Sequence, residues 1–401
     1  MSYNYFRYYF LKSNLIKLFK KFNLPFVILS SSFISYITIY KYFYNKNIKC
    51  YNNKNEKYND PLWRSKIRKS LENSKDVCII SGTANKELSI EVADRLNLEL
   101  EHVKIDHILT GEININFENS LLGKSVFIIQ PTSPSVNSNL AELLFLILQA
   151  KREGAKEIHA IIPYLGYSTY TTSLDHKNPI CSADIAKMLK TAGANTITTL
   201  DVHTGQIEGF YDIPFDDIPS DIILTEYILN SNLITNFNKF VLVSPNANRI
   251  KRCVKQAESI AKRTGVPSSI AMTISKNSFT NNMKNKNSNN IYLIGDVKGK
   301  DCIIIDDIIK SGKSIFDSAK ELKINGARKV YAFTSHYLYL NLNNDYLENS
   351  HIDKLITTNS TSSSIIDSKK LIVLSVGPLL AEIIRRIHNK ESVSELINDI
   401  V

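Results

Sequence analysis

Apolar and polar positions follow two alternating patterns along most of this 401-residue chain. Short runs rich in Val, Ile and Phe, such as 240–244 (FVLVS), are typical of strands that are covered on both faces. The segments between them carry apolar residues at helical spacing, as at Ile315, Ala319 and Leu322. The pattern predicts strands at 77–80, 126–130, 159–163, 196–201, 240–244, 269–274, 291–294, 302–306, 330–335 and 371–375. It predicts helices at 85–96, 140–153, 182–192, 249–264, 314–326 and 378–388.

This alternation of strands and helices predicts an α/β fold with parallel sheets whose faces are covered by helices. The elements form two series, so we expect two similar halves, which we place at 61–225 and 226–375. The polar, low-complexity segment 277–290 interrupts the second series and is typical of an exposed loop.

The first 60 residues differ in composition from the rest. Residues 24–40 (LPFVILSSSFISYITIY) are uncharged and largely apolar, and Lys17, Lys20 and Lys21 precede them. A basic segment followed by an apolar one is typical of a targeting leader, although this run is barely long enough to cross a membrane. An uncleaved signal anchor, an organelle-targeting leader and a merely biased tail all fit. We expect targeting or membrane contact through 24–40, with the body of the protein in the cytoplasm.

The net charge of +10 does not indicate a nucleic-acid-binding protein. Residues 1–55 carry nine Lys and Arg residues and no acid, so the remainder is close to neutral. A basic footprint on the folded body is therefore not expected. The five cysteines form no C-x-x-C pair, which favours a reducing compartment without zinc or disulfides.

Residues 301–314 (DCIIIDDIIKSGKS) hold the most informative motif of the chain. They predict a buried strand, then the adjacent carboxylates Asp306 and Asp307, then a small polar turn and the start of a helix. A helix N-terminus suits a phosphate, and two carboxylates suit sugar hydroxyls or a metal ion. A Walker A loop would need glycine where Asp307 stands, so that reading is excluded. An ordinary strand-to-helix turn with solvated acids remains the alternative.

A second segment, 201–216 (DVHTGQIEGFYDIPFD), follows another predicted strand. It places Asp201, His203, Asp212 and Asp216 within sixteen residues. Because alternate residues of an extended chain point the same way, Asp201 and His203 could meet one metal ion.

With these two motifs, the chain resembles the ribose-phosphate pyrophosphokinases, or PRPP (phosphoribosyl pyrophosphate) synthetases. The resemblance spans most of the chain in the family's order. It rests on SGTANKEL (81–88), GKSVFIIQP (123–131), IIPYLGY (161–167), AGANTITTLDVHTGQIEGFYDIPFD (192–216), VSPNANRIKR (243–252), GDVKGKDCIIIDD (295–307), GARKVYAFTSH (326–336) and AEIIRRIHNKESVSEL (381–396).

The resemblance implies two phosphoribosyltransferase-like domains in tandem, with the C-terminal segment 376–401 packed back on the first. It implies transfer of a diphosphoryl group from Mg²⁺–ATP to ribose 5-phosphate, which gives PRPP for nucleotide biosynthesis. The implied roles are as follows: Lys276 and His203 in catalysis; Asp306, Asp307, Ser311, Gly312, Lys313 and Ser314 on ribose 5-phosphate; Glu112 and His203 on the nucleotide; Asp201, His203, Asp212 and Asp216 on Mg²⁺.

Several positions depart from the family's pattern. The arginines expected in the segment after Tyr167 and in the loop after Lys276 are replaced by Thr169 and Ser278. An aromatic residue expected against adenine is Ile108, and Lys310 replaces an acid. These losses of cations and of stacking predict an enzyme that is slow or inactive.

The phosphate-side motif is altered as well, because SPDAGG of the family is SPNANR here. Asn246 stands for the acid, and Asn248 and Arg249 stand for two glycines. Three functions from different classes follow: a divergent PRPP synthetase, a catalytically impaired regulatory subunit, and a sensor of nucleotide or sugar phosphate. We favour the synthetase, and expect a homo-oligomer or a hetero-oligomer with other PRPP synthetase chains.

Overall fold

The computed structural model describes residues 71, 74–169, 171, 180–275, 291–338, 344–361 and 368–400. The leader prediction, including 24–40, and the predicted loop 277–290 lie outside the described residues. Among the described residues, no helix combines the length and apolarity that crossing a membrane requires.

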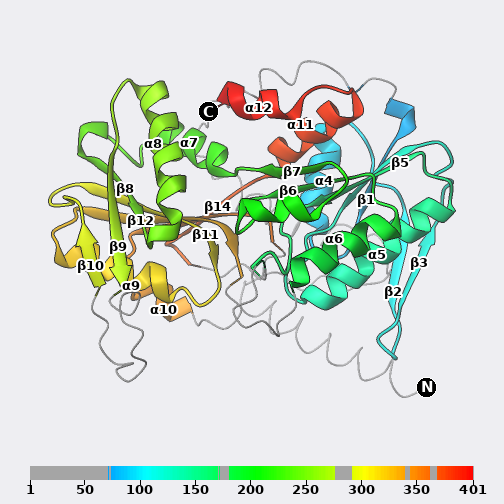
Figure 1. Cartoon of the computed structure of the whole chain (residues 1–401), viewed down its shortest axis with the longest axis horizontal. Helices are drawn as coiled ribbons and strands as arrows, with labels where there is room; N and C mark the ends of the chain where they lie inside the picture. The colour runs from blue at the N-terminus through cyan, green and yellow to red at the C-terminus, as the bar shows by residue number, and fades with distance from the viewer. Residues whose placement is uncertain are drawn as a thin grey trace, which may run out of the picture. The chain divides into compact units, whose positions relative to one another are not determined.

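The first sheet has five strands in the order β1-β4-β5-β6-β7, and all neighbouring pairs are parallel (Figure 1). An antiparallel hairpin, β2-β3, stands apart from it. The strands of this part are β1 (Val77–Ser81), β2 (Val103–His107), β3 (Ile113–Phe117), β4 (Ser125–Ile129), β5 (Glu157–Ile162), β6 (Thr196–Leu200) and β7 (Phe215–Ile218). The helices are η1 (Ser74–Asp76), α4 (Lys86–Arg95), α5 (Val136–Arg152), α6 (Cys181–Ala192), η2 (Gly205–Phe210) and α7 (Asp221–Asn230).

The second sheet has seven strands in the order β10-β9-β8-β11-β12-β13-β14, and only β10 pairs antiparallel. Its strands are β8 (Phe240–Ser244), β9 (Ser269–Ser275), β10 (Ile291–Ile294), β11 (Asp301–Ile309), β12 (Lys329–Tyr337), β13 (Lys354–Thr358) and β14 (Leu371–Leu374). The helices of this half are η3 (Phe237–Lys239), η4 (Ala247–Arg249), α8 (Ile250–Thr264), α9 (Lys313–Ile324) and α10 (Asn344–Glu348). Helices α11 (Gly377–His388) and α12 (Val393–Ile400) end the chain. The predicted α/β fold with parallel sheets is confirmed.

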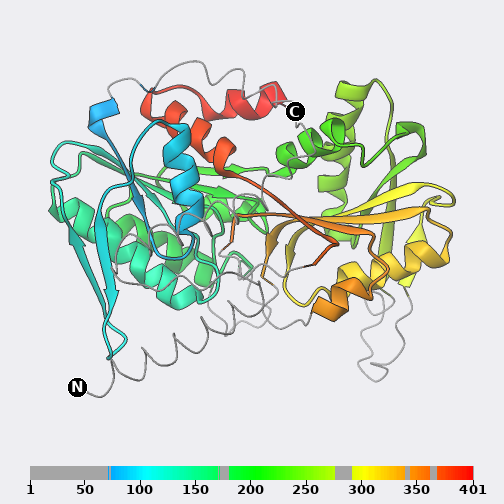
Figure 2. The same cartoon turned by 180° about the vertical axis from the view of Figure 1, so that it is seen from behind.

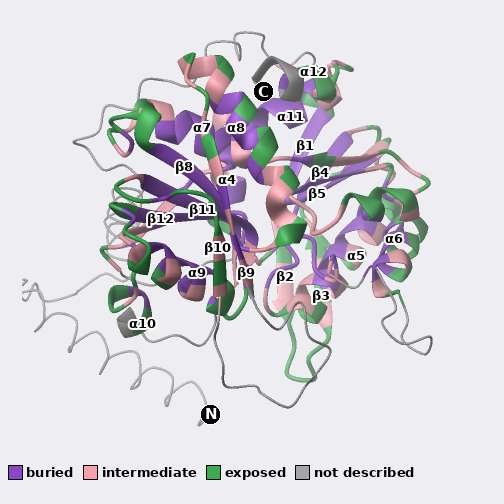
Figure 3. Ribbon diagram, turned by 60° about the vertical axis from the view of Figure 1, so that its left-hand side comes forward, coloured by how far each residue is buried: buried purple, intermediate pink, exposed green. Residues whose placement is uncertain are grey.

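Alternate strand residues face opposite helical layers, as a strand's period of two requires. In β1, Val77 and Ile79 face one core, while Cys78 and Ile80 face another, which α5 and α6 cover. The second sheet packs α9 on one face in the same way, and purple buried strands run through both halves in Figure 3. The four cysteines among the described residues are free, and Cys78, Cys253 and Cys302 are buried.

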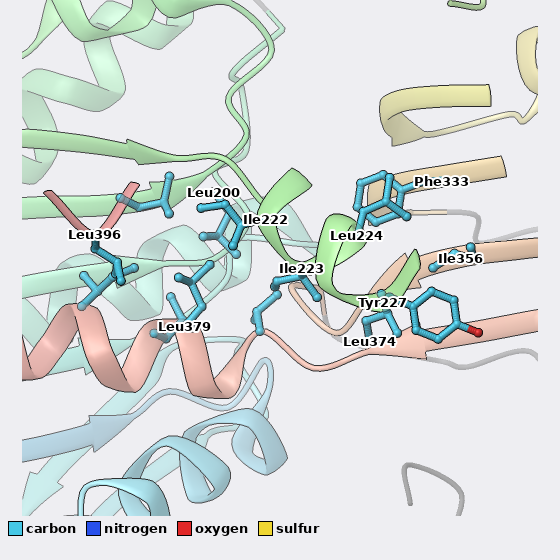
Figure 4. Close-up of a cluster of buried hydrophobic side chains, with 14 of the residues drawn as sticks. Leu200, Ile222, Ile223, Leu224, Tyr227, Phe333, Ile356, Leu374, Leu379 and Leu396 are labelled. Atoms are coloured by element: carbon cyan, nitrogen blue, oxygen red, sulfur yellow. The ribbon is translucent and has the colours of Figure 1, made fainter. Parts of the chain in front are cut away.

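One apolar core connects the two sheets. It includes residues of α7, α11 and α12 together with strands of both sheets (Figure 4). Its labelled members are Leu200, Ile222, Ile223, Leu224, Tyr227, Phe333, Ile356, Leu374, Leu379 and Leu396. Helix α11 lies beside α4 in both views of the chain (Figures 1 and 2). Helix α11, which follows the last strand of the second sheet, therefore returns to the first half of the chain and packs on α4.

The buried imidazole of His159 predicts acid-sensitive folding. His159 is 5% exposed, bonds Thr196 Oγ1 at 2.8 Å and stacks on Phe127 at 4.5 Å between ring centroids. Burial lowers the pKa of His159 to about 4, although Glu157 opposes the shift. The unfolded chain binds a proton near pH 6.5 and the folded one does not, so stability is lost as pH falls from 6.5 toward 4.

Urea unfolding at pH 7 and pH 5 tests this. The parent should lose about 2 kcal/mol more than His159→Asn over that interval. The buried His336 is present in both proteins and cancels from the comparison. An equal loss in the two proteins would show that His159 is not the acid-sensitive group.

Candidate active site

Charged and polar side chains gather where strands of the two sheets end near each other. The carbonyl oxygen of Leu200, the last residue of β6, accepts a hydrogen bond from His336 Nε2 of β12 at 3.0 Å. Ser220, before α7, donates to Ser335 Oγ of β12 at 2.8 Å. Ligands of open α/β sheets bind outside the carboxyl ends of the strands. The junction is therefore the candidate site.

Arg252 of α8 holds the buried part of this junction together. Its Nη2 lies 3.2 Å from Asp201 Oδ1, 2.6 Å from Asp221 Oδ1 and 2.8 Å from Ser335 Oγ. Burial favours a raised pKa for Asp201, but Arg252 and the hydroxyl of Ser220 outweigh it and the pKa is lowered. For Asp221, burial outweighs Arg252 and the pKa is raised to about 6.

Asp306 and Asp307 lie within a strand rather than after one. The prediction ended the strand at Asp306, but β11 runs to Ile309 because its pairing with β12 continues past the acids, for example Ile308 with His336. Both aspartates are buried. The acid pair therefore stands on a rigid element, and its geometry is set by the sheet.

Arg249 is the counter-ion of this acid pair. Its Nη2 lies 2.7 Å from Asp307 Oδ2, and its Nε lies 3.3 Å from Asp306 Oδ1. His203 Nδ1, from the loop after β6, lies 2.8 Å from Asp307 Oδ2, so both halves contribute. Burial favours a raised pKa for Asp307, but His203 and Arg249 outweigh it, so the pKa of Asp307 is lowered. Burial and the charge of Asp307 raise the pKa of Asp306 to about 7.

The turn after β11 has the geometry of a phosphate loop. Gly312 has φ +70°, and a Cβ there would lie 2.3 Å from Phe316 Cε2, so glycine is required. Helix α9 begins at Lys313, and Ser311, Lys313 and Ser314 are exposed. The N–H groups of the helix's first turn can donate hydrogen bonds to an anion beside the acid pair.

Lys310 extends from this turn to the other half of the chain. Its Nζ donates to Thr169 Oγ1 at 3.2 Å. Thr169 is where the resemblance expects an arginine, so a cation from a different segment reaches that place. In the sequence, Lys310 reverses the charge of an acid expected by the resemblance, and it is also one of three cations, with Lys313 and Arg249, that could replace the missing arginines.

The four predicted metal donors do not form a preformed ion site. Asp201 has φ +42°, so the extended alternation that was to align it with His203 is absent. Asp212 is exposed and pairs with Lys190, which lowers the pKa of Asp212; Asp216 lies in β7, where burial and Glu208 raise its pKa. Within the described ranges, no group of three or more His, Cys, Asp or Glu residues is arranged to hold a metal.

Two further predicted site residues are Lys276 and Glu112. Lys276 is outside the described residues. Glu112 stands at the turn of the β2-β3 hairpin, where its Oε2 accepts a hydrogen bond from Thr110 at 2.8 Å and Ile108 is 46% exposed. Figure 1 places this turn far from β11. Within one chain, Glu112 does not join the acid pair.

Sequence reasoning missed Arg252, Asp221 and His336 as members of the site. All three lie in or near segments that the resemblance covers, but their partners are distant in sequence, so no local spacing connects them. A usable signal was the presence of charged residues in otherwise apolar segments, since buried charges are nearly always paired.

The chain has two largely parallel sheets covered by helices, and an acid pair that precedes a turn and a helix N-terminus. These features define a protein of the phosphoribosyltransferase-like class. A family model described as the N-terminal domain of ribose phosphate pyrophosphokinase matches residues 77–193. A second, described as a phosphoribosyl synthetase-associated domain, matches 250–398. The chain belongs to the ribose-phosphate pyrophosphokinase family.

Individual relatives support this assignment. The chain is 34% identical over 318 residues to the ribose-phosphate pyrophosphokinase of Wolinella succinogenes, covering 79% of this chain and 98% of that one. It is 38% identical over 321 residues to that of Listeria ivanovii, with coverages of 79% and 96%. The crystal structure of phosphoribosylpyrophosphate synthetase from Mycobacterium smegmatis matches with a TM-score of 0.71 and 30% identity, covering 79% of this chain and 99% of that one.

Proposed function

We propose that this chain is a ribose-phosphate pyrophosphokinase that transfers a diphosphoryl group from Mg²⁺–ATP to the anomeric hydroxyl of ribose 5-phosphate. The products are PRPP and AMP. The observation that carries the proposal is the position of Asp306 and Asp307 on β11, immediately before the phosphate-type turn and the N-terminus of α9. Family membership supports the same reaction.

The acid pair and the turn divide the sugar phosphate between them. Ribose hydroxyls donate hydrogen bonds to Asp306 and Asp307. The 5-phosphate accepts hydrogen bonds from the backbone N–H groups of residues 311–314. Because the acids and the turn belong to one continuous strand, turn and helix, they hold the sugar in one orientation. The reaction needs no covalent intermediate, so orientation and charge neutralisation are the protein's contribution.

The donors of this chain fit a Mg²⁺ ion shared with a nucleotide, not an ion enclosed by protein alone. Mg²⁺ is commonly held by one or two side chains together with substrate phosphates. His203, whose side chain is 34% exposed, is placed to contribute, while Asp201 is held by Arg252 and acts through its charge. When bound, Mg²⁺ neutralises phosphate charge. Asp212 and Asp216 would serve it only after rearrangement, and Lys276 would face the transferred phosphates.

Assembly with further chains is part of the proposal. The hairpin turn that carries Glu112 is remote from its own acid pair, so Glu112 can serve a nucleotide at such a site only from a neighbouring copy or from a related synthetase chain. A homo-oligomer or hetero-oligomer would provide that neighbour. A catalytically impaired regulatory subunit is the alternative, and it predicts assembly with an active chain without turnover of its own.

An AMP-release assay on the full chain tests the function. With ATP, Mg²⁺ and ribose 5-phosphate present, we expect AMP formation that stops when EDTA removes Mg²⁺. Asp307→Asn should reduce the rate by about 10²-fold, because an oriented acceptor of the sugar is lost. Asp296→Asn is the matched control, since Asp296 is exposed and pairs only locally with Lys300.

Two results would contradict the proposal. One is no AMP formation from the folded parent, alone or with added copies of a related synthetase chain. The other is equal rates for Asp307→Asn and Asp296→Asn. AMP formation only in the presence of an active partner chain, at the partner's own rate, would favour the regulatory subunit.

A further inference from the structure

Arg249 occupies the place at which a sugar must reach the acid pair. All three of its guanidinium nitrogens are engaged: Nε with Asp306 Oδ1 at 3.3 Å, Nη1 with the carbonyl oxygen of His203 at 3.0 Å, and Nη2 with Asp307 Oδ2 at 2.7 Å. Its side chain is 15% exposed, so the guanidinium covers the carboxylates from solvent. A sugar hydroxyl that binds Asp306 Oδ1 or Asp307 Oδ2 therefore competes with this arginine for the same oxygen atom.

The acid pair is nevertheless incompletely satisfied. Asp307 Oδ1 is buried and lacks a hydrogen-bond partner among the described residues. A buried carboxylate oxygen without a donor is costly, and a ligand hydroxyl would supply one. The site is thus built for a further donor, and Arg249 satisfies it only in part.

Arg249 is also placed where its side chain can leave without disturbing the backbone. It ends the short helix η4 and caps α8, and the turn before it is held independently of its side chain. Asn246 Oδ1 accepts a hydrogen bond from the N–H of Asn248 at 3.0 Å, and the hydroxyl of Ser244 donates to the carbonyl of Asn246 at 2.6 Å. Rotation about the side-chain bonds of Arg249 would release its contacts with both acids while these two hydrogen bonds of the turn stay in place.

We propose that Arg249 competes with the sugar hydroxyls for Asp306 and Asp307 and thereby sets the affinity of the site for its sugar phosphate. The proposal rests on the proposed function of the acid pair. A charge-assisted bond from guanidinium is roughly twice as strong as a neutral one, so the closed form predominates without ligand. The apparent affinity is then reduced by the fraction of molecules in which the acids are open.

Calorimetric titration of the full chain with ribose 5-phosphate tests the competition. Arg249→Ala should bind at least tenfold more tightly than the parent, and Arg249→Lys should bind a few-fold more tightly, because lysine offers one point charge instead of a fork. Inorganic phosphate is the second probe. It uses the turn at 311–314 and not the acids, so its affinity should not increase in either variant.

Arg263→Ala is the matched control, since Arg263 lies on the same helix and pairs with Glu226 instead of the site. It should leave both affinities unchanged. If Arg249→Ala fails to fold, the affinity of Arg249→Lys for ribose 5-phosphate is compared with that of the parent instead. Weaker or equal binding of ribose 5-phosphate by the folded Arg249 variants would overturn the proposal and make Arg249 a ligand-binding cation. Absence of binding in parent and variants alike would overturn the proposed function together with it.

Discussion

Replacing Arg252 by alanine is expected to destabilise the fold by about 3–5 kcal/mol, because it leaves two buried carboxylates without their cation. Asp201 and Asp221 both depend on its Nη2, and Ser335 of β12 bonds the same atom. These partners come from the loop after β6, from α7 and from the second sheet. The loss should therefore affect the junction that supports the active site. Urea unfolding of the full chain, followed by circular dichroism, measures it.

Four further variants locate the cause of that loss. Arg95→Ala removes a partly exposed arginine that pairs with Glu91 one helical turn away, and it should cost less than about 1 kcal/mol. Arg252→Lys should recover only part of the stability, since lysine cannot bond both acids as a planar fork. Arg252→Met combined with Asp201→Asn and Asp221→Asn should be more stable than Arg252→Met alone. Equal losses for Arg252→Ala and Arg95→Ala would show that the buried pairing contributes little.

The period of the apolar residues was sufficient to predict most buried strands and helices. Strand β8, for example, was predicted with its observed bounds, because a run covered on both faces carries no competing pattern. Strands β2, β3, β7 and β13 were missed; the first three are only partly buried, whereas β13 is buried. In β3 (ININF) every second residue is polar, a pattern typical of a half-buried strand that a count at period two would have found.

The candidate site was predictable only where its residues are neighbours in sequence. The order of strand, acids, turn and helix was predicted because these parts follow one another in the sequence, while the roles of the acids and the turn stay predictions. The pairing of Arg249 with His203 and of Arg252 with Asp201 depends on how α8 packs across the junction, which no local spacing encodes. The metal prediction assumed an extended backbone from Asp201 to His203. Asp201 instead has a left-handed φ, so the assumed alignment of the two side chains does not hold.

The length of strand β11 at the acid pair was also underestimated from the sequence. The polar character of Asp306 and Asp307 indicated the end of a strand, since buried carboxylates are rarely left unpaired. Arg249 and His203 supply the compensation from other elements, and β11 continues to Ile309. A local rule failed here because tertiary partners satisfied the buried charge, as is common at functional sites.

Lys310 is expected to be the cation whose loss has the largest effect on turnover. The resemblance to the family calls for an arginine at Thr169, and Lys310 Nζ bonds Thr169 Oγ1 at 3.2 Å. In other phosphoryl-transfer enzymes an arginine that neutralises the transition state contributes about 10³-fold or more. Lys310→Met should therefore lower kcat by about 10²- to 10³-fold, with a small change in KM for ribose 5-phosphate.

Steady-state AMP release by the full chain measures both constants, with Lys320→Met, an exposed position on α9, as the control. If Lys310 stands in for the missing arginine, then Lys310→Met combined with Thr169→Arg should regain much of the lost kcat, because a cation returns to the same place. The kcat should not return fully to that of the parent, because Ser278 also replaces an expected arginine and the effects of groups that act together are not additive. Three outcomes would contradict the assignment: a rate for Lys310→Met equal to that of Lys320→Met, a rise in KM for ribose 5-phosphate at unchanged kcat, or no gain from Thr169→Arg. The second of these would place Lys310 on the sugar phosphate instead of the transferred group.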